Sequence, residues 1–363
     1  MSGQNRIYPL FLPHLGCPFQ CVYCNQHVVT YSPDQILSTR EEGATEILNR
    51  LDALAEQARS SGRSGEIAFY GGTFTALPPE TLRAVLEAAS DRVREGVFSG
   101  IRFSTRPDCL SPETGSLLSR YPVSTVELGA QSLSDSVLAS TRRGYTAKAV
   151  EAASALVREH GWSLGIQLMA GLPGDTKALF LESIRKAIRL GPSFVRIYPT
   201  LVLAGTLMAE WYGSGVFRPL ELEDALDWCA DGWDLLRSAG VPAARMGLHA
   251  DPELEKPGMV LAGPYHPAFG YLVRVRSWRN RVDEALGEMV SGGAGFQEGI
   301  TIEVAARQVS EAIGPGRSNL LYWQGEWNVE NVRVLGARKR APESFAVLLN
   351  HPFAPPGECV EYS

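Results

Sequence analysis

The chain has 363 residues, of which 45% are apolar and 20% are charged, and its formal net charge at pH 7 is −6. This composition supports one large domain, or a large domain with a smaller one, and argues against a protein that coats nucleic acid through bulk positive charge. The apolar stretch 7–13 is short and contains Pro9, so it predicts neither a signal peptide nor a membrane span. We therefore expect a cytoplasmic protein with no membrane partner.

The first two thirds of the chain alternate between short apolar runs and stretches of helical periodicity. The predicted strands are 6–12, 66–70, 100–104, 125–128, 163–169 and 194–198, and the predicted helices between them are 39–59, 79–94, 112–120, 147–159 and 177–190. Six strand–helix units in series favour an α/β fold, a partial (β/α)6 TIM-type barrel, over a doubly wound sheet. We expect this core barrel in residues 1–240 and a smaller C-terminal α+β domain, covering the barrel mouth, in residues 241–363.

Three cysteines, Cys17, Cys21 and Cys24, follow the first predicted strand in the run GCPFQCVYCNQ. Their C-x-x-x-C-x-x-C spacing allows three thiolates to ligate three irons of one iron–sulfur cube and leaves the fourth iron open to a cofactor. A disulfide is disfavoured because three is an odd number and nothing marks the chain as secreted. A zinc site with His27 as fourth ligand is a serious alternative, and unrelated buried thiols are a weaker one. The barrel pattern favours the cluster, because a zinc finger does not need a barrel.

Polar motifs follow the other predicted strands, at the C-terminal ends where a parallel barrel carries its active face. Gly71-Gly72 allows a ligand to approach backbone amides closely, although a plain tight turn would have the same residues. Arg106, Asp108 and Tyr198, after the third and sixth strands, are the residues that could act on a substrate. The alternative for Arg106 and Asp108 is a mutual ion pair that fixes the turn.

Several stretches resemble the radical S-adenosylmethionine (SAM) enzymes, in particular the group that contains the Elongator catalytic subunit and the oxygen-independent coproporphyrinogen-oxidase-like proteins. They are PHLGCPFQCVYCNQ, FYGGTFTALP, STRPD, VELGAQS, RRGYT, LMAGLPGDT, VRIYPTLVLAGT and GPYHPAFG. The resemblance implies a [4Fe–4S] cluster on Cys17, Cys21 and Cys24, which cleaves SAM to a radical that abstracts hydrogen from a substrate. Where the Elongator subunit has a glutamate before T-R-P-D, this chain has Ser104, and it carries no acetyltransferase signature.

The resemblance also assigns roles to individual side chains. An arginine such as Arg143 can hold the SAM carboxylate with two parallel hydrogen bonds, although a surface salt bridge is the commoner fate of an arginine. The residues expected to contact SAM are Tyr23, Gly71, Gly72, Thr73, Gln131, Arg143, Gln167 and Met169. Reduced flavodoxin or ferredoxin is the expected electron donor.

The substrate is open at this point. One hypothesis is a tRNA base, with the arginines of 274–281 and 338–340 forming an RNA surface, although the net negative charge favours a merely solvated face. A second is a small tetrapyrrole-like molecule whose propionates would need cationic partners, for which Arg106 and Arg196 are candidates. A third is a metal-binding protein that is not an enzyme.

Overall fold

The computed structural model describes residues 6–12, 17, 21–25, 40–248, 254–296, 298–350 and 359–362. The chain divides into two compact units: Met1–Trp228 with Leu235–Pro267, and Cys229–Asp234 with Ala268–Ser363. The predicted domain boundary at residue 240, and a C-terminal domain that covers the barrel mouth, stay predictions. Among the described helices, none combines the length and the apolar character that crossing a bilayer requires.

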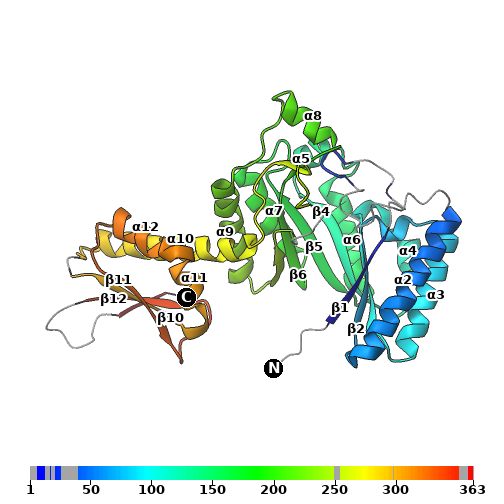
Figure 1. Ribbon diagram of the computed structural model, residues 1–363, viewed down its shortest axis with the longest axis horizontal. Coiled ribbons are helices and arrows are strands. Elements are labelled where there is room, and N and C mark those ends of the chain that lie inside the picture. The colour runs from blue at the N-terminus through cyan, green and yellow to red at the C-terminus, as the bar shows by residue number, and fades with distance from the viewer. Residues whose placement is uncertain are drawn as a thin grey trace. The chain divides into compact units, whose positions relative to one another are not determined.

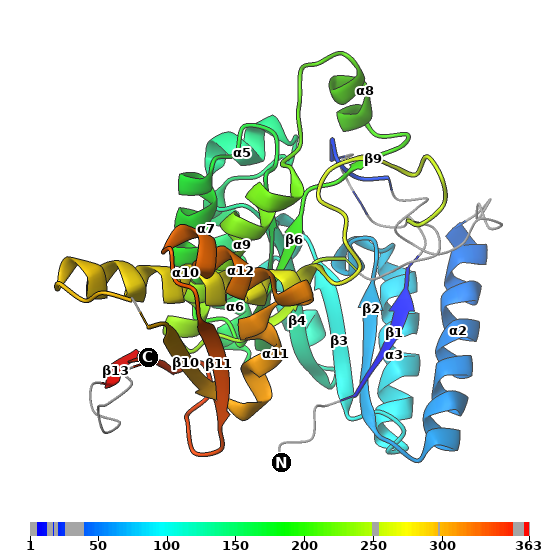
Figure 2. The ribbon, with the colours of Figure 1, turned by 60° about the vertical axis from the view of Figure 1, so that its left-hand side comes forward.

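The first unit is built on a seven-stranded sheet in which each strand pairs in parallel with its neighbours, in the order β1-β2-β3-β4-β5-β6-β8. This order lets the sheet curl into a half-barrel (Figures 1 and 2). The predicted partial barrel is confirmed, with β8 as a strand beyond the six expected. The strands are β1 Arg6–Phe11, β2 Gly65–Tyr70, β3 Gly100–Thr105, β4 Val123–Gln131, β5 Ser163–Ala170, β6 Phe194–Pro199 and β8 Ala243–Met246.

Helices connect these strands, and their boundaries follow local sequence signals. Pro79 and Pro112 occupy the first positions of α3 and α4, where the missing N–H has no cost. Ser111 and Thr176 cap α4 and α7 by accepting hydrogen bonds from backbone N–H groups in the first turn. The helices are α2 Arg40–Ser61, α3 Pro79–Arg94, α4 Pro112–Leu118, α5 Asp135–Ser140, α6 Ala147–Glu159, α7 Lys177–Arg189, α8 Leu207–Gly213 and α9 Leu222–Ser238.

Short elements complete the first unit. The 3-10 turns η1 Phe74–Ala76 and η2 Pro107–Cys109 follow β2 and β3 directly, at the edge where the sequence predicts the site. The strands β7 Val202–Leu203 and β9 Val260–Ala262 form a separate antiparallel pair.

The two faces of the half-barrel sheet differ sharply in chemistry. Alternate strand residues on one face are apolar and fully buried, and α3, α6 and α7 pack against the strands there. Residues of the opposite face include the buried Glu66, Arg102 and Glu127 and the half-buried Arg196. The interior of a β/α barrel is normally filled with branched apolar side chains. The charged interior is therefore the surface on which a polar ligand is to be sought.

The second unit is an α+β domain, as the sequence predicts. Its sheet has the order β11-β10-β12-β13, and its core contains Trp278, Trp323 and Phe345. The elements are α10 Phe269–Ser291, β10 Ile300–Ala305, η3 Ala306–Gln308, α11 Val309–Ile313, η4 Pro315–Arg317, α12 Ser318–Glu326, β11 Val332–Ala337, β12 Phe345–Leu349 and β13 Cys359–Tyr362.

The basic segment of the second unit lies on α10, and its arginines contact their own domain. Arg274 pairs with Glu311 at 2.6 Å, and Arg279 donates to the side chain of Asn319 at 3.0 Å. The side chain of Arg281 is only 10% exposed, and its guanidinium lies over the rings of the domain core. These contacts are the structural alternative to an RNA surface, so this segment gives the RNA hypothesis no support.

Candidate functional site

The cysteine loop lies beyond the C-terminal end of β1 and is attached to the neighbouring strand. The sulfur of Cys17 lies 3.3 Å from the hydroxyl of Thr73, which follows Gly71-Gly72 at the end of β2. The N–H of Cys24 donates to the carbonyl of Cys21 at 3.1 Å, which closes the turn between them. All three thiols are free, with Cys21 buried and the other two half-buried. The loop thus presents unpaired sulfurs at the rim where the sequence predicts the cofactor.

A buried guanidinium contacts this loop. Nη1 of Arg143 lies 3.0 Å from the sulfur of Cys21 and 3.2 Å from the hydroxyl of Tyr23. Its Nη2 donates to the Gly129 carbonyl at 2.7 Å, and the hydroxyl of Tyr145 accepts from both Nε and Nη2. Burial raises the pKa of Tyr23 well above its usual value, so that its hydroxyl stays protonated at neutral pH.

These residues have the chemistry that an iron–sulfur cluster requires. Three free thiols share one loop, and the guanidiniums of Arg143 and Arg106 lie 3.0 and 4.0 Å from the sulfur of Cys21, where they can offset the negative charge of a metal-bound thiolate. Within the described part of the chain, no three Cys, His, Asp or Glu side chains are already gathered into a metal-binding group. His27, the fourth ligand of the zinc alternative, lies outside the described residues.

The end of β4 is distorted where it carries Gln131. Leu128 pairs with Ile166 but Gln131 pairs with Leu168, so β4 has one residue more than β5 between these points. Gln131 has a φ of 64°, an unfavourable value for a side chain with a Cβ, and it is buried. Its Oε1 accepts a hydrogen bond from Gln167 at 3.2 Å. Strain of this kind is typical of functional sites, and here it brings together two of the residues expected to contact SAM.

The other predicted rim residues lie on neighbouring strand ends. Gly71 has a φ of 103°, a conformation that only glycine adopts easily, and it is exposed. Met169 on β5 and Tyr198 on β6 are register partners, and both are half-buried. Met169 is two residues from Gln167 along its strand, so the two side chains share the interior face.

Arg106 and Asp108 form an ion pair at the start of η2. Nε and Nη2 of Arg106 lie 3.0 and 2.9 Å from the two carboxylate oxygens of Asp108. Burial lowers the pKa of Arg106, but hydrogen bonding to Asp108 outweighs it and the net shift is upward. Arg106 also donates to the Arg143 carbonyl. The pair fixes the turn beside the cysteine loop, and a direct action of either residue on the substrate stays a prediction.

Sequence analysis missed a network of buried charges on the interior face. Glu127 on β4 pairs with Nε of Arg102 at 3.0 Å and with Nε of Arg196 at 2.8 Å. Arg102 pairs in turn with Glu66 at 3.2 Å. Tyr70 donates its hydroxyl to Glu127 at 2.8 Å, and burial raises the pKa of this tyrosine, so it stays a donor. The available signal was the presence of charged residues at alternate positions of otherwise apolar strands.

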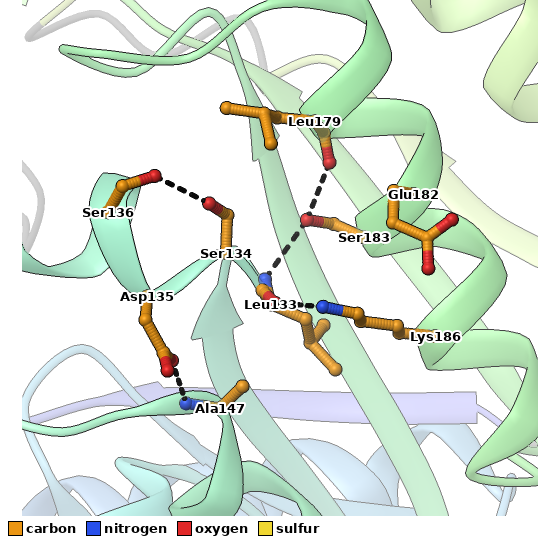
Figure 3. Close-up of a pocket in the computed structure, with 9 residues that line it drawn as sticks. All are labelled: Leu133, Ser134, Asp135, Ser136, Ala147, Leu179, Glu182, Ser183 and Lys186. Carbon is orange, nitrogen blue, oxygen red and sulfur yellow. Dashed lines mark hydrogen bonds between the residues drawn. The ribbon is translucent and has the colours of Figure 1, made fainter.

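A cavity of about 270 Å³ lies elsewhere, on the helical side of the first unit (Figure 3). The loop after β4, the beginning of α6 and one face of α7 line it. Lys186 donates to the Leu133 carbonyl at 3.1 Å and Ser183 accepts from the Leu133 N–H at 3.1 Å, so these polar groups anchor the loop. The lining contains none of the residues predicted for the cluster or SAM, and the cavity belongs to the scaffold.

A parallel half-barrel with three cysteines in a loop at its C-terminal rim defines a class of cluster-dependent enzymes. The family model of the radical SAM superfamily matches residues 12–187, and that of the Radical_SAM C-terminal domain matches residues 192–281. The chain belongs to the radical SAM superfamily. It is a radical SAM enzyme whose cofactors are a [4Fe–4S] cluster and SAM, which sets aside the zinc alternative and the reading as a protein that is not an enzyme.

Individual relatives cover only part of this relationship. A tRNA uridine(34) acetyltransferase of Dehalococcoides mccartyi is 25% identical over 247 residues, which are 60% of this chain and 53% of the relative. Protein YhcC of Escherichia coli K12 is 26% identical over 210 residues, or 56% of this chain and 63% of the relative. The solved structure of an archaeal Elp3 from Methanocaldococcus infernus has a TM-score of 0.52 at 22% identity, covering 68% of this chain and 59% of that one, and supports the fold.

Proposed function

We propose that Cys17, Cys21 and Cys24 hold the [4Fe–4S] cluster and that the enzyme abstracts hydrogen from a tRNA base. When bound, the cluster and SAM supply an electron and a hydrogen-abstracting radical. The observation that carries the proposal is the contact of Arg143 with Cys21 at 3.0 Å, because it brings the predicted carboxylate-binding guanidinium to the predicted cluster loop.

The residues around this contact divide the work of holding SAM. Arg143 binds the SAM carboxylate, after exchanging part of its contacts with Tyr23 and Tyr145 for it. The backbone after β2, at Gly71-Gly72-Thr73, approaches the amino group. Tyr23, Gln131, Gln167 and Met169 surround the remainder of the molecule. The two-sided fixation of Arg143 by Tyr145 and the Gly129 carbonyl orients its guanidinium in advance.

The tRNA substrate is supported by the name of one relative, a tRNA uridine(34) acetyltransferase. The chain spans 53% of that relative's length, so the substrate is carried over only as a proposal. Reduced flavodoxin or ferredoxin delivers the electron, and a reducing cytoplasm suits an oxygen-sensitive cluster.

The test uses anaerobically reconstituted protein, SAM, dithionite and bulk tRNA from a strain that lacks this gene. We expect 5′-deoxyadenosine to form faster with this tRNA than without it, and one nucleoside of the digested tRNA to change in mass. tRNA from the parent strain, already modified, is the matched control. Equal 5′-deoxyadenosine formation with and without tRNA, and no altered nucleoside, would rule out the tRNA substrate.

A second candidate, a small tetrapyrrole-like or other acidic molecule, is favoured by one observation. Arg196 lies on the interior face of the half-barrel, where a carboxylate of a small substrate could reach it. Under this candidate, a small-molecule extract of the deletion strain stimulates 5′-deoxyadenosine formation and tRNA does not.

A further inference from the structure

The edge between β6 and β8 contains an irregularity that places two arginines side by side. Val195 pairs with Ala243, but Arg196 pairs with Arg245, so Ala244 is an extra residue in β8. Without this bulge Ala244 would lie opposite Arg196, and Arg245 would point to the other face of the sheet. Bulges are rare in parallel pairs and are frequent next to active sites, where they re-aim a side chain. The bulge therefore brings a second guanidinium to the interior face.

Arg196 is held rigidly beside this edge. Its Nε lies 2.8 Å from Glu127, and its Nη2 lies 3.1 Å from the hydroxyl of Tyr70. Its Nη1 points to the hydroxyl of Tyr198 at 3.4 Å. Glu127 thus fixes one side of the guanidinium, while the other side meets a tyrosine hydroxyl that can also donate to a ligand.

Arg245 lies in surroundings that disfavour its positive charge. Burial lowers the pKa of Arg245, the nearby Tyr198 hydroxyl raises it, and the positive charge of Arg196 lowers it, with a net downward shift. Its Nε donates to the Gly247 carbonyl at 2.9 Å, which orients the guanidinium. An oxyanion bound between the two arginines would relieve their repulsion and form charge-assisted hydrogen bonds with both.

We propose that Arg196, Arg245 and Tyr198 form a subsite for an oxyanion of the substrate, a carboxylate or a phosphate, on the interior face of the half-barrel. The inference deepens the proposed function and rests on it. Tyr198 is the register partner of Met169, so the subsite adjoins the residues expected to contact SAM. It anchors the charged end of the substrate and leaves the reacting C–H bond nearer the rim.

The test is calorimetric titration of the SAM-saturated, reconstituted enzyme with uridine 5′-monophosphate, uridine and succinate. We expect uridine 5′-monophosphate or succinate to bind and uridine not to bind. The variant Arg245→Gln should weaken anion binding about 10- to 100-fold, the effect of losing a hydrogen bond between charged groups. Arg245→Lys should fall between, because an ammonium keeps the charge but not the paired geometry. Arg218→Gln, at an exposed position, is the matched control and should bind like the wild type.

The outcomes separate the sources of the oxyanion and the two proposals. Binding of the nucleotide alone indicates a phosphate, and binding of succinate indicates a carboxylate. No anion binding by the wild type, or equal binding by Arg245→Gln, overturns the subsite. If Arg245→Gln does not fold, Tyr198→Phe and Arg245→Lys decide, since both should weaken binding. SAM cleavage by the wild type is measured on the same preparation: its absence refutes the proposed function, while the titration still decides the subsite.

Discussion

Glu127 is the residue whose replacement most directly tests the charged interior of the half-barrel. Its side chain is 5% exposed and lies between Arg102 and Arg196, with the hydroxyl of Tyr70 as a third partner. The substitution Glu127→Gln keeps the shape and an acceptor for Tyr70, and removes only the negative charge.

The expected cost follows from what remains around the two arginines. Removing one partner of a buried ion pair typically costs about 3–5 kcal/mol, because the other charge stays buried without compensation. Arg102 keeps Glu66 at 3.2 Å, which limits its share of the loss. Arg196 keeps only weaker hydroxyl neighbours among its contacts described above. We therefore expect a loss of about 3 kcal/mol in the free energy of unfolding of Glu127→Gln.

The assay is anaerobic urea unfolding followed by circular dichroism at pH 7. Glu182→Gln is the matched control, because Glu182 also faces two arginines, Arg185 and Arg189, but all three side chains are at least 44% exposed. Exposed pairs contribute little, so the control should lose less than about 0.5 kcal/mol. A loss below about 1 kcal/mol for Glu127→Gln, or one equal to the control's, would refute the reasoning that the network is held by buried charge.

Two further predictions concern the rim. Arg143→Ala should weaken SAM binding about 30-fold, equivalent to about 2 kcal/mol, whereas Arg142→Ala at the exposed neighbouring position should change it less than twofold; equal losses in SAM titrations would contradict the assignment. Burial raises the pKa of Asp175 to about 6 despite the N–H donors of Gly171 and Thr176, so its contribution to stability is present below pH 4 and is lost as the pH rises through 6. Asp175→Asn should therefore flatten the decline in unfolding free energy between pH 4 and 7 by about 1–2 kcal/mol, and an unchanged slope would count against it.

The elements of the half-barrel could be predicted because its strands are apolar and its helices strictly periodic. The strand β8 could not, since Ala243–Met246 has only four residues and no apolar alternation. The irregularities near Gln131 and at Ala244 were also beyond prediction, because a bulge is defined by the partner strand rather than by its own sequence.

The candidate site was predictable where short motifs carry it and not where distant residues meet. The three cysteines and Gly71-Gly72 stand in local patterns, whereas the contact between Arg143 and Cys21 joins residues 122 positions apart. The arginines of α10 show the same limit in reverse. Their charge pattern indicates a basic surface, but partners such as Glu311 come from elements that only tertiary folding brings near.

The most direct test of the account compares iron content and SAM cleavage in anaerobically reconstituted wild type, Cys21→Ala and Cys229→Ala. The wild type should hold about four irons per chain and form 5′-deoxyadenosine, and Cys21→Ala should lose most of both. Cys229 is a buried thiol on α9, outside the cysteine loop, and its replacement should leave both unchanged. A wild-type protein that holds zinc and no iron, or a Cys21→Ala variant that still cleaves SAM at the wild-type rate, would contradict the account.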